Sequence, residues 1–224
     1  RLGPHNAADP LAGHRPGQPW GWKLCETVYA LPVLARAFPG ARFVHLLRDG
    51  RDVAFSDHVA PELPFWRRVY FATDALRAWQ GMGLRYADYI RRPHLYNAQH
   101  WQESVRLARS YGAMLGPAFR EIRYEALCAD PMAEGRALMR WLGHATNEEA
   151  LSALAERTER GAIGKHRRQP ARQQREVLEL IEPMLLSCGY GEARLMPSAR
   201  DRRQALVQRL RMGLARRWRE RAFR

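Results

Sequence analysis

The chain has 224 residues, of which 37 are Lys or Arg, 23 are Asp or Glu and 46% are apolar. This length fits one domain with a sizeable core, and the ordinary apolar fraction excludes disorder of the whole chain. No apolar run reaches the length of about 18 residues that a membrane-spanning helix needs, so such a helix is excluded as well.

The net charge of +14 is uneven, because residues 200–224 hold ten Arg and two acidic residues. Apolar residues recur every fourth position in this tail, which predicts a basic amphipathic helix over 199–224. We expect it to follow a main domain at 21–198 and an irregular lead-in at 1–20. The tail could lie on an anionic membrane surface, pack against the domain or be disordered, and the sequence leaves these alternatives open.

The three cysteines, Cys25, Cys128 and Cys188, are far apart and form no Cys-x-x-Cys pair. This spacing predicts free thiols in a reducing compartment and signals neither a zinc site nor a disulfide framework. We therefore expect a cytoplasmic protein, with peripheral membrane contact through the tail as the open alternative.

The first elements alternate between helix and strand. Apolar spacing predicts a helix over 26–38, which Pro39-Gly40 ends, and the apolar run 42–47 has the length of a strand. His45 alternates into this strand and is expected in the core. A polar turn over 48–52 and a new helix from Val53 follow. The order helix, strand, turn, helix makes half of a βαβ unit.

The later elements are mostly helical. Residues 119–124 alternate as a second strand, residues 125–130 are predicted as a loop, and Gly161–Lys165 as a glycine-bearing loop. Helices are predicted over 66–90, 98–115, 131–142, 147–158 and 172–187, with Gly143 as a stop signal.

The turn after the first strand is the most informative segment. Arg48 ends the apolar strand, and a helix follows whose free N–H groups would face a bound anion. Its guanidinium suits bidentate phosphate binding, and Ser56 could reach the same anion if the turn folds back. The alternative is a surface turn with Arg–Asp pairs, such as Arg51 with Asp49.

The stretch from Phe38 to Ser56, FPGARFVHLLRDGRDVAFS, resembles the 3′-phosphate-binding segment of sulfotransferases, bacterial members and tyrosylprotein sulfotransferases in particular. Those enzymes use 3′-phosphoadenosine 5′-phosphosulfate as donor. The resemblance implies that Arg48 and Ser56 hold the 3′-phosphate of this co-substrate and that no metal is needed. It also implies a three-layer α/β/α fold with a parallel sheet, like that of P-loop NTPases.

Three further segments resemble the family in order and spacing, over roughly residues 20–190. The match implies that Lys23 contacts the phosphosulfate bridge and that Tyr124 lies near the adenine. The loop at residues 160–165 is similar to the family's late basic-glycine loop. Arg160 matches its phosphate-binding position best, and Lys165 and Arg167 are weaker candidates because the aromatic-basic ending is altered to His166-Arg167.

The family's 5′-phosphosulfate loop is not seen in residues 1–20, and no Gly-x-x-x-x-Gly-Lys-Ser/Thr pattern occurs. Because the first residue is Arg, we expect a fragment that lacks the first βα unit, and catalysis by this length of chain is an open question. The catalytic base is also open: Glu26 is the first candidate and His58 the second. A helix-start role for Glu26 and a structural role for His58 are the competing interpretations.

The resulting hypothesis is a sulfotransferase that acts on a hydroxyl or amine of a glycan, lipid or small molecule. A kinase-like phosphotransferase on the same scaffold would need a Walker loop and acidic magnesium ligands, which the sequence does not show. An Arg-rich nucleic-acid-binding module would spread its charge over the domain, whereas most of the excess charge lies in the tail. We therefore expect a nucleotide donor and an acceptor as partners, and no specific nucleic acid.

Overall fold

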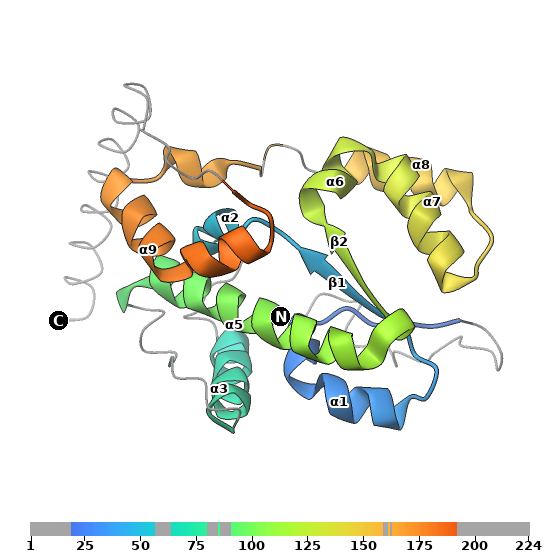
Figure 1. Ribbon diagram of the computed structural model, residues 1–224, viewed down its shortest axis with the longest axis horizontal. Helices are drawn as coiled ribbons and strands as arrows, with labels where there is room; N and C mark the ends of the chain where they lie inside the picture. The colour runs from blue at the N-terminus through green and yellow to red at the C-terminus, as the bar shows by residue number, and fades with distance from the viewer. Residues whose placement is uncertain are drawn as a thin grey trace.

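The described chain is a helix-rich α/β structure built around two parallel strands (Figure 1). The computed structural model describes residues 19–56, 64–79, 85, 91–158, 161 and 163–191. In the helix at 64–79, side chains are described only at residues 68 and 72–78. In chain order the elements are α1 (Thr27–Ala37), β1 (Phe43–Leu47), α2 (Gly50–Ala54), α3 (Pro64–Trp79), α5 (Pro93–Leu115), the 3-10 turn η2 (Gly116–Ala118), β2 (Phe119–Arg123), α6 (Tyr124–Ala129), α7 (Pro131–Leu142), α8 (Glu148–Arg157), the 3-10 turn η4 (Lys165–Arg168) and α9 (Ala171–Ser187).

Local chemistry fixes the helix ends on the C-terminal side of β2. The Asp130 side chain accepts a hydrogen bond from the Ala133 N–H at the start of α7, and Asn147 caps α8 in the same way. Gly143 ends α7 at φ 74°, a left-handed conformation that glycine adopts without the steric cost of a Cβ. The predicted start of α8 and stop of α7 are therefore confirmed.

The two strands pair in register from Phe43 opposite Phe119 to Leu47 opposite Arg123. Both predicted strands are confirmed, and their parallel order follows from the helical crossover that contains α5. On one face of the sheet Glu121 binds Arg109 of α5, with Nη2 2.7 Å from Oε1. On the other face the Arg120 guanidinium donates to the Ala137 carbonyl of α7 at 2.8 Å.

The main core lies where α2, α5 and α9 meet, to the left of the sheet in Figure 1. It is formed by buried apolar residues that include Leu47, Ala54, Trp101, Val177 and Ile181. Because this core holds α2 against both long helices, the segment that follows β1 has a rigid support on its buried side.

One face of β1 is only partly covered. Val44 and Leu46 are 45% and 50% exposed, whereas Ile122, opposite Leu46 on β2, is buried. Helix α7 thus covers this face over β2 and leaves it open over β1. Parallel strands are normally covered on both faces, so β1 presents an apolar surface that the described residues leave uncovered.

Three local predictions were wrong. The helix after β1 begins at Gly50, because Asp49 caps it, and it ends at Ala54, so Ser56 lies beyond the helix. Residues 124–129 form helix α6 instead of a loop, since Glu125 suits a first turn and Ala126-Leu127 favour helix. His45 is half-buried and hydrogen-bonded to Glu121 instead of lying in the core.

Candidate functional site

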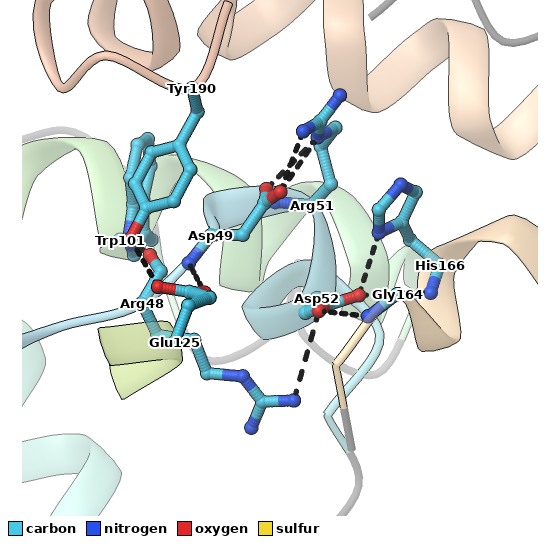
Figure 2. Close-up of polar contacts among 9 residues, drawn as sticks. All are labelled: Arg48, Asp49, Arg51, Asp52, Trp101, Glu125, Gly164, His166 and Tyr190. Carbon is cyan, nitrogen blue, oxygen red and sulfur yellow. Dashed lines mark hydrogen bonds and ion pairs between the residues drawn. The ribbon is translucent and has the colours of Figure 1, made fainter. Parts of the chain in front are cut away.

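Arg48 occupies the carboxyl end of β1, where ligands of open α/β sheets usually bind. Its carbonyl oxygen accepts a hydrogen bond of 2.9 Å from the Trp101 indole N–H, which fixes the end of the strand to α5 (Figure 2). Its guanidinium carbon lies 4.8 Å from the centre of the Tyr124 ring. The side chain remains 20% exposed, so the charge can meet a ligand from solvent.

The turn after Arg48 is held by Asp49. The Asp49 carboxylate accepts from the Arg51 backbone N–H at 2.9 Å and pairs with the Arg51 guanidinium at 2.6 Å. Burial would lower the pKa of Arg51, but the hydrogen bonds that Arg51 donates to Asp49 and the neighbouring carboxylates outweigh it and raise that pKa. The Arg51–Asp49 pair considered from the sequence is therefore present, but its side chains are only 14% and 11% exposed, so it is not a surface pair.

Glu125 of α6 ties this turn to the end of β2. Its Oε1 accepts from the Asp49 backbone N–H at 2.9 Å, and its Oε2 accepts from the Tyr190 hydroxyl at 2.8 Å (Figure 2). Burial, together with the Glu125 carboxylate, raises the pKa of Tyr190, so the phenol stays a proton donor. Because Tyr124 precedes Glu125, the same anchor positions the aromatic ring beside Arg48.

Asp52 ties the late glycine loop to α2. Its carboxylate is fully buried and accepts from the Gly164 N–H at 2.7 Å, the His166 N–H at 3.0 Å and the His166 ring Nδ1 at 2.6 Å. Burial would raise the pKa of Asp52, but these hydrogen bonds outweigh it and hold the pKa below its ordinary value. Asp52 Oδ2 also lies 3.9 Å from Arg48 Nη2, so one carboxylate faces both the loop and the strand end.

Three of the four segments singled out in the sequence therefore meet: the Arg48 turn, the Tyr124 helix and the loop that holds Lys165. Lys165 is half-buried at the start of η4, and Arg167 is exposed. Arg160 and His58 lie outside the described residues, so their assignments stay predictions.

Arg48 precedes helix α2, whereas Ser56 follows the end of this helix at Ala54. Its backbone carbonyl accepts from the Asn97 side chain at 3.1 Å, and Asn97 also bonds the Ala54 carbonyl. This pair of bonds fixes the chain that leaves α2 to helix α5. The joint grip of Arg48 and Ser56 on one phosphate stays a prediction.

Lys23 and Glu26 lie apart from these groups in the hydrogen-bond network. Lys23 is exposed and its ammonium lies 3.4 Å from the Cys25 sulfur, while the preceding Trp22 packs against Phe43 at the amino end of β1. Glu26 precedes α1 and makes no side-chain capping bond. Within the described residues, no hydrogen bond or ion pair joins Lys23 or Glu26 to the Arg48 turn, and their catalytic roles remain predictions.

The sequence reasoning missed the residues that build the site: Asp52, Trp101, Glu125, His166 and Tyr190. One signal was available, since acidic residues alternate with arginines in the Arg48 turn and such carboxylates need partners when buried. Over the described ranges, no group of three or more His, Cys, Asp or Glu residues could hold a metal ion. None of the described helices is both long and apolar enough to span a bilayer.

Comparison with known protein families identifies the class. The model of the sulfotransferase family matches residues 5–148, which is more than half of the 224 residues. No curated protein and no solved structure matched the chain. The chain belongs to the sulfotransferase family, and it is therefore a transferase enzyme whose general chemistry is sulfuryl transfer.

The matched range contains Lys23, Arg48, Ser56 and Tyr124 but ends before the glycine loop. That loop is joined to the matched part through Asp52, with hydrogen bonds across 112 and 114 positions of sequence. The family assignment also favours the enzyme over the nucleic-acid-binding module that the composition left open.

Proposed function

We propose that the protein transfers a sulfuryl group from 3′-phosphoadenosine 5′-phosphosulfate to a hydroxyl or amine of a glycan, lipid or small-molecule acceptor. One observation carries the proposal: the partly exposed Arg48 guanidinium lies against the Tyr124 ring at the carboxyl end of β1. A phosphorylated nucleoside offers a phosphate and a base, and a fixed cation beside an aromatic face can bind both.

The residues at this place fit such a co-substrate. The Arg48 backbone is anchored by Trp101 and its guanidinium lies against the Tyr124 ring, so the side chain needs little ordering when an anion arrives. Asp52 ties the basic segment Lys165–Arg168 to the same turn. This segment adds positive charge near Arg48. A metal ion has no part in this proposal.

In the proposed mechanism the bound co-substrate supplies an activated sulfuryl group. Arg48 and Ser56 bind the 3′-phosphate, Tyr124 lies beside the adenine, and Arg160 and Lys165 add charge from the loop. Lys23 stabilises the charge that develops on the leaving phosphate oxygen. Glu26 or His58 takes the proton of the acceptor as its oxygen or nitrogen bonds to sulfur.

The finer fold belongs to the same proposal. We infer a three-layer α/β/α sandwich related to P-loop NTPases, in which further elements cover β1. The half-covered face at Val44 and Leu46 supports this, because parallel strands seldom expose apolar side chains. Peripheral contact of the tail 199–224 with an anionic membrane is a proposal on charge alone, since the tail lies outside the described residues.

The experiment is a calorimetric titration of the full chain with adenosine 3′,5′-bisphosphate and with ADP, which lacks the 3′-phosphate. We expect the bisphosphate to bind more tightly, and Arg48→Ala to weaken it by about 10- to 100-fold, because a charge-assisted hydrogen bond contributes about 1.5–3 kcal/mol. Arg136→Ala, at an exposed pair with Glu148 on α7 and α8, is the matched control.

Ser56→Ala tests the second half of the phosphate grip, and we expect a smaller loss because a neutral hydroxyl is a weaker donor. Donor assays with the phosphosulfate and with ATP separate sulfuryl from phosphoryl transfer. Equal binding of the two nucleotides, or an Arg48→Ala protein that binds like the native chain, contradicts the proposed donor.

A further inference from the structure

The loop between α8 and α9 is attached to α2 through the buried carboxylate of Asp52. Asp52 is fully buried and His166 is 4% exposed. Three hydrogen bonds join Asp52 to Gly164 and His166, and they are 2.6–3.0 Å long. A buried carboxylate is stable only where such partners surround it, so this contact fixes where the loop lies.

The attachment sets the backbone around Lys165. Gly164 adopts φ 74°, and η4 begins at the next residue, so Lys165 lies between the two amide groups that bind Asp52. Any shift of Asp52 therefore moves the chain on both sides of Lys165. Substituting Gly164 would strain the left-handed backbone that allows both amides to reach one carboxylate.

The same carboxylate also faces the strand end. Oδ2 accepts the Gly164 N–H at 2.7 Å and lies 3.9 Å from Arg48 Nη2. Asp52 is thus placed between the two halves of the proposed nucleotide site, the Arg48 turn and the basic loop. Figure 2 shows the Arg48 guanidinium below this carboxylate and the His166 ring above it.

Only one nitrogen of the His166 ring serves this contact. Nδ1 lies 2.6 Å from Asp52 Oδ1, whereas Nε2 is buried and has no hydrogen-bond partner among the described residues. The ring therefore acts through Nδ1. An Asn side chain can place its amide nitrogen where Nδ1 lies, whereas that of Gln lies one bond further out.

We propose that Asp52 and His166 are positioning residues for donor binding: they hold the Lys165 segment at the Arg48 turn and do not themselves contact the donor. This inference rests on the proposed function, because it assumes that the nucleotide binds between Arg48 and the loop. The proposed function thereby gains two further residues, Asp52 and His166, whose role depends on the contact between His166 Nδ1 and the Asp52 carboxylate.

The test compares His166→Asn with His166→Gln in the full chain, titrated with adenosine 3′,5′-bisphosphate. We expect His166→Asn to bind within a few-fold of the native chain and His166→Gln to bind about tenfold more weakly, the loss expected for one hydrogen bond to a charged group. His45→Gln is the matched control, since His45 forms a similar contact of 3.1 Å with Glu121, also through Nδ1 and away from the loop.

Two further readouts separate positioning from simple stability. Asp52→Asn is expected to speed amide hydrogen exchange at Gly164 and His166 in the absence of nucleotide, because both amides lose a charged acceptor. Thermal unfolding of each variant identifies the temperature at which it is fully folded, and binding is measured there. If Asp52→Asn does not fold, the two His166 variants still decide the question.

The outcomes are distinct. Rescue by Asn, with loss in Gln at a temperature where both are folded, supports the assignment. Equal binding by native chain and His166→Gln, while Arg48→Ala loses binding, overturns the positioning role and leaves the proposed donor intact. Absence of binding by the native chain overturns the proposed donor, and this assignment with it.

Discussion

The Arg48 guanidinium lies over the ring of Tyr124, with 4.8 Å between the guanidinium carbon and the ring centre. The two residues come from different strands: Arg48 follows β1 and Tyr124 follows β2. Parallel pairing brings both strand ends to the same edge, and Glu125 locks the second to the first through the Asp49 N–H. The parallel topology therefore brings the two side chains together, although they are far apart in the sequence.

This contact predicts that nucleotide binding depends more on the ring of Tyr124 than on its hydroxyl. Tyr124→Leu removes the aromatic face beside Arg48 and should weaken binding of adenosine 3′,5′-bisphosphate about fivefold, since a cation–π contact contributes about 1 kcal/mol. Tyr124→Phe keeps the face and should bind nearly as well as the native chain. Calorimetric titration of both variants checks this, and equal losses in Leu and Phe would assign the effect to the hydroxyl instead.

A second prediction concerns the close approach of α2 to α5. A Cβ on Gly50 would lie 2.5 Å from the Trp101 ring, and that ring also donates to the Arg48 carbonyl. Because an indole cannot yield as a flexible chain does, Gly50→Ala should destabilise the protein by about 1–3 kcal/mol and weaken nucleotide binding. Chemical unfolding and calorimetric titration measure the two effects.

Gly135→Ala is the matched control for this substitution. Its Cβ would lie 2.4 Å from the end of the Leu151 side chain, which can rotate away, and it lies within α7. Alanine favours a helix interior over glycine by about 1 kcal/mol, which offsets the cost of moving Leu151. A Gly50→Ala protein as stable as Gly135→Ala would show that Trp101 moves freely and is not a rigid anchor.

Much of the order of elements could be predicted from the sequence. An apolar run located the first strand and alternation located the second, while Asn147 and Gly143 marked helix ends, because these signals act over a few residues. Helix α6 was missed since six residues are too few for a helical period to show. The half-exposed Val44 and Leu46 could not be foreseen, because apolar character does not tell which face of a strand is covered.

The site was predictable only in part. Arg48 and Tyr124 could be singled out by their motifs, and the structure places them together. Asp52 could not be assigned from its own segment, because its partner His166 lies 114 positions later in the chain. The polar turn also resembled a surface turn, since the burial that makes Asp49 and Asp52 structural comes from elements distant in sequence.

The last prediction concerns acid stability and the sheet. Burial would raise the pKa of Glu121, but hydrogen bonds from His45 and Arg109 outweigh it and lower the pKa from 4.5 to about 2. A carboxyl whose pKa is depressed on folding stabilises the native state above its unfolded pKa. This contribution is therefore complete above pH 4.5 and is lost as the pH falls towards about 2.

Glu121→Gln should accordingly lower the free energy of unfolding at pH 7 by about 2 kcal/mol and flatten its decline in acid. Chemical unfolding at a series of pH values between 7 and the acid limit measures both. Glu149→Gln removes the same charge at an exposed position on α8, and it should follow the native curve. The free energy of unfolding of Glu121→Gln could instead fall with pH as steeply as that of the native chain. In that case another carboxyl controls the loss of stability in acid, and the bonds from β1 and α5 to Glu121 contribute little to the stability of the sheet.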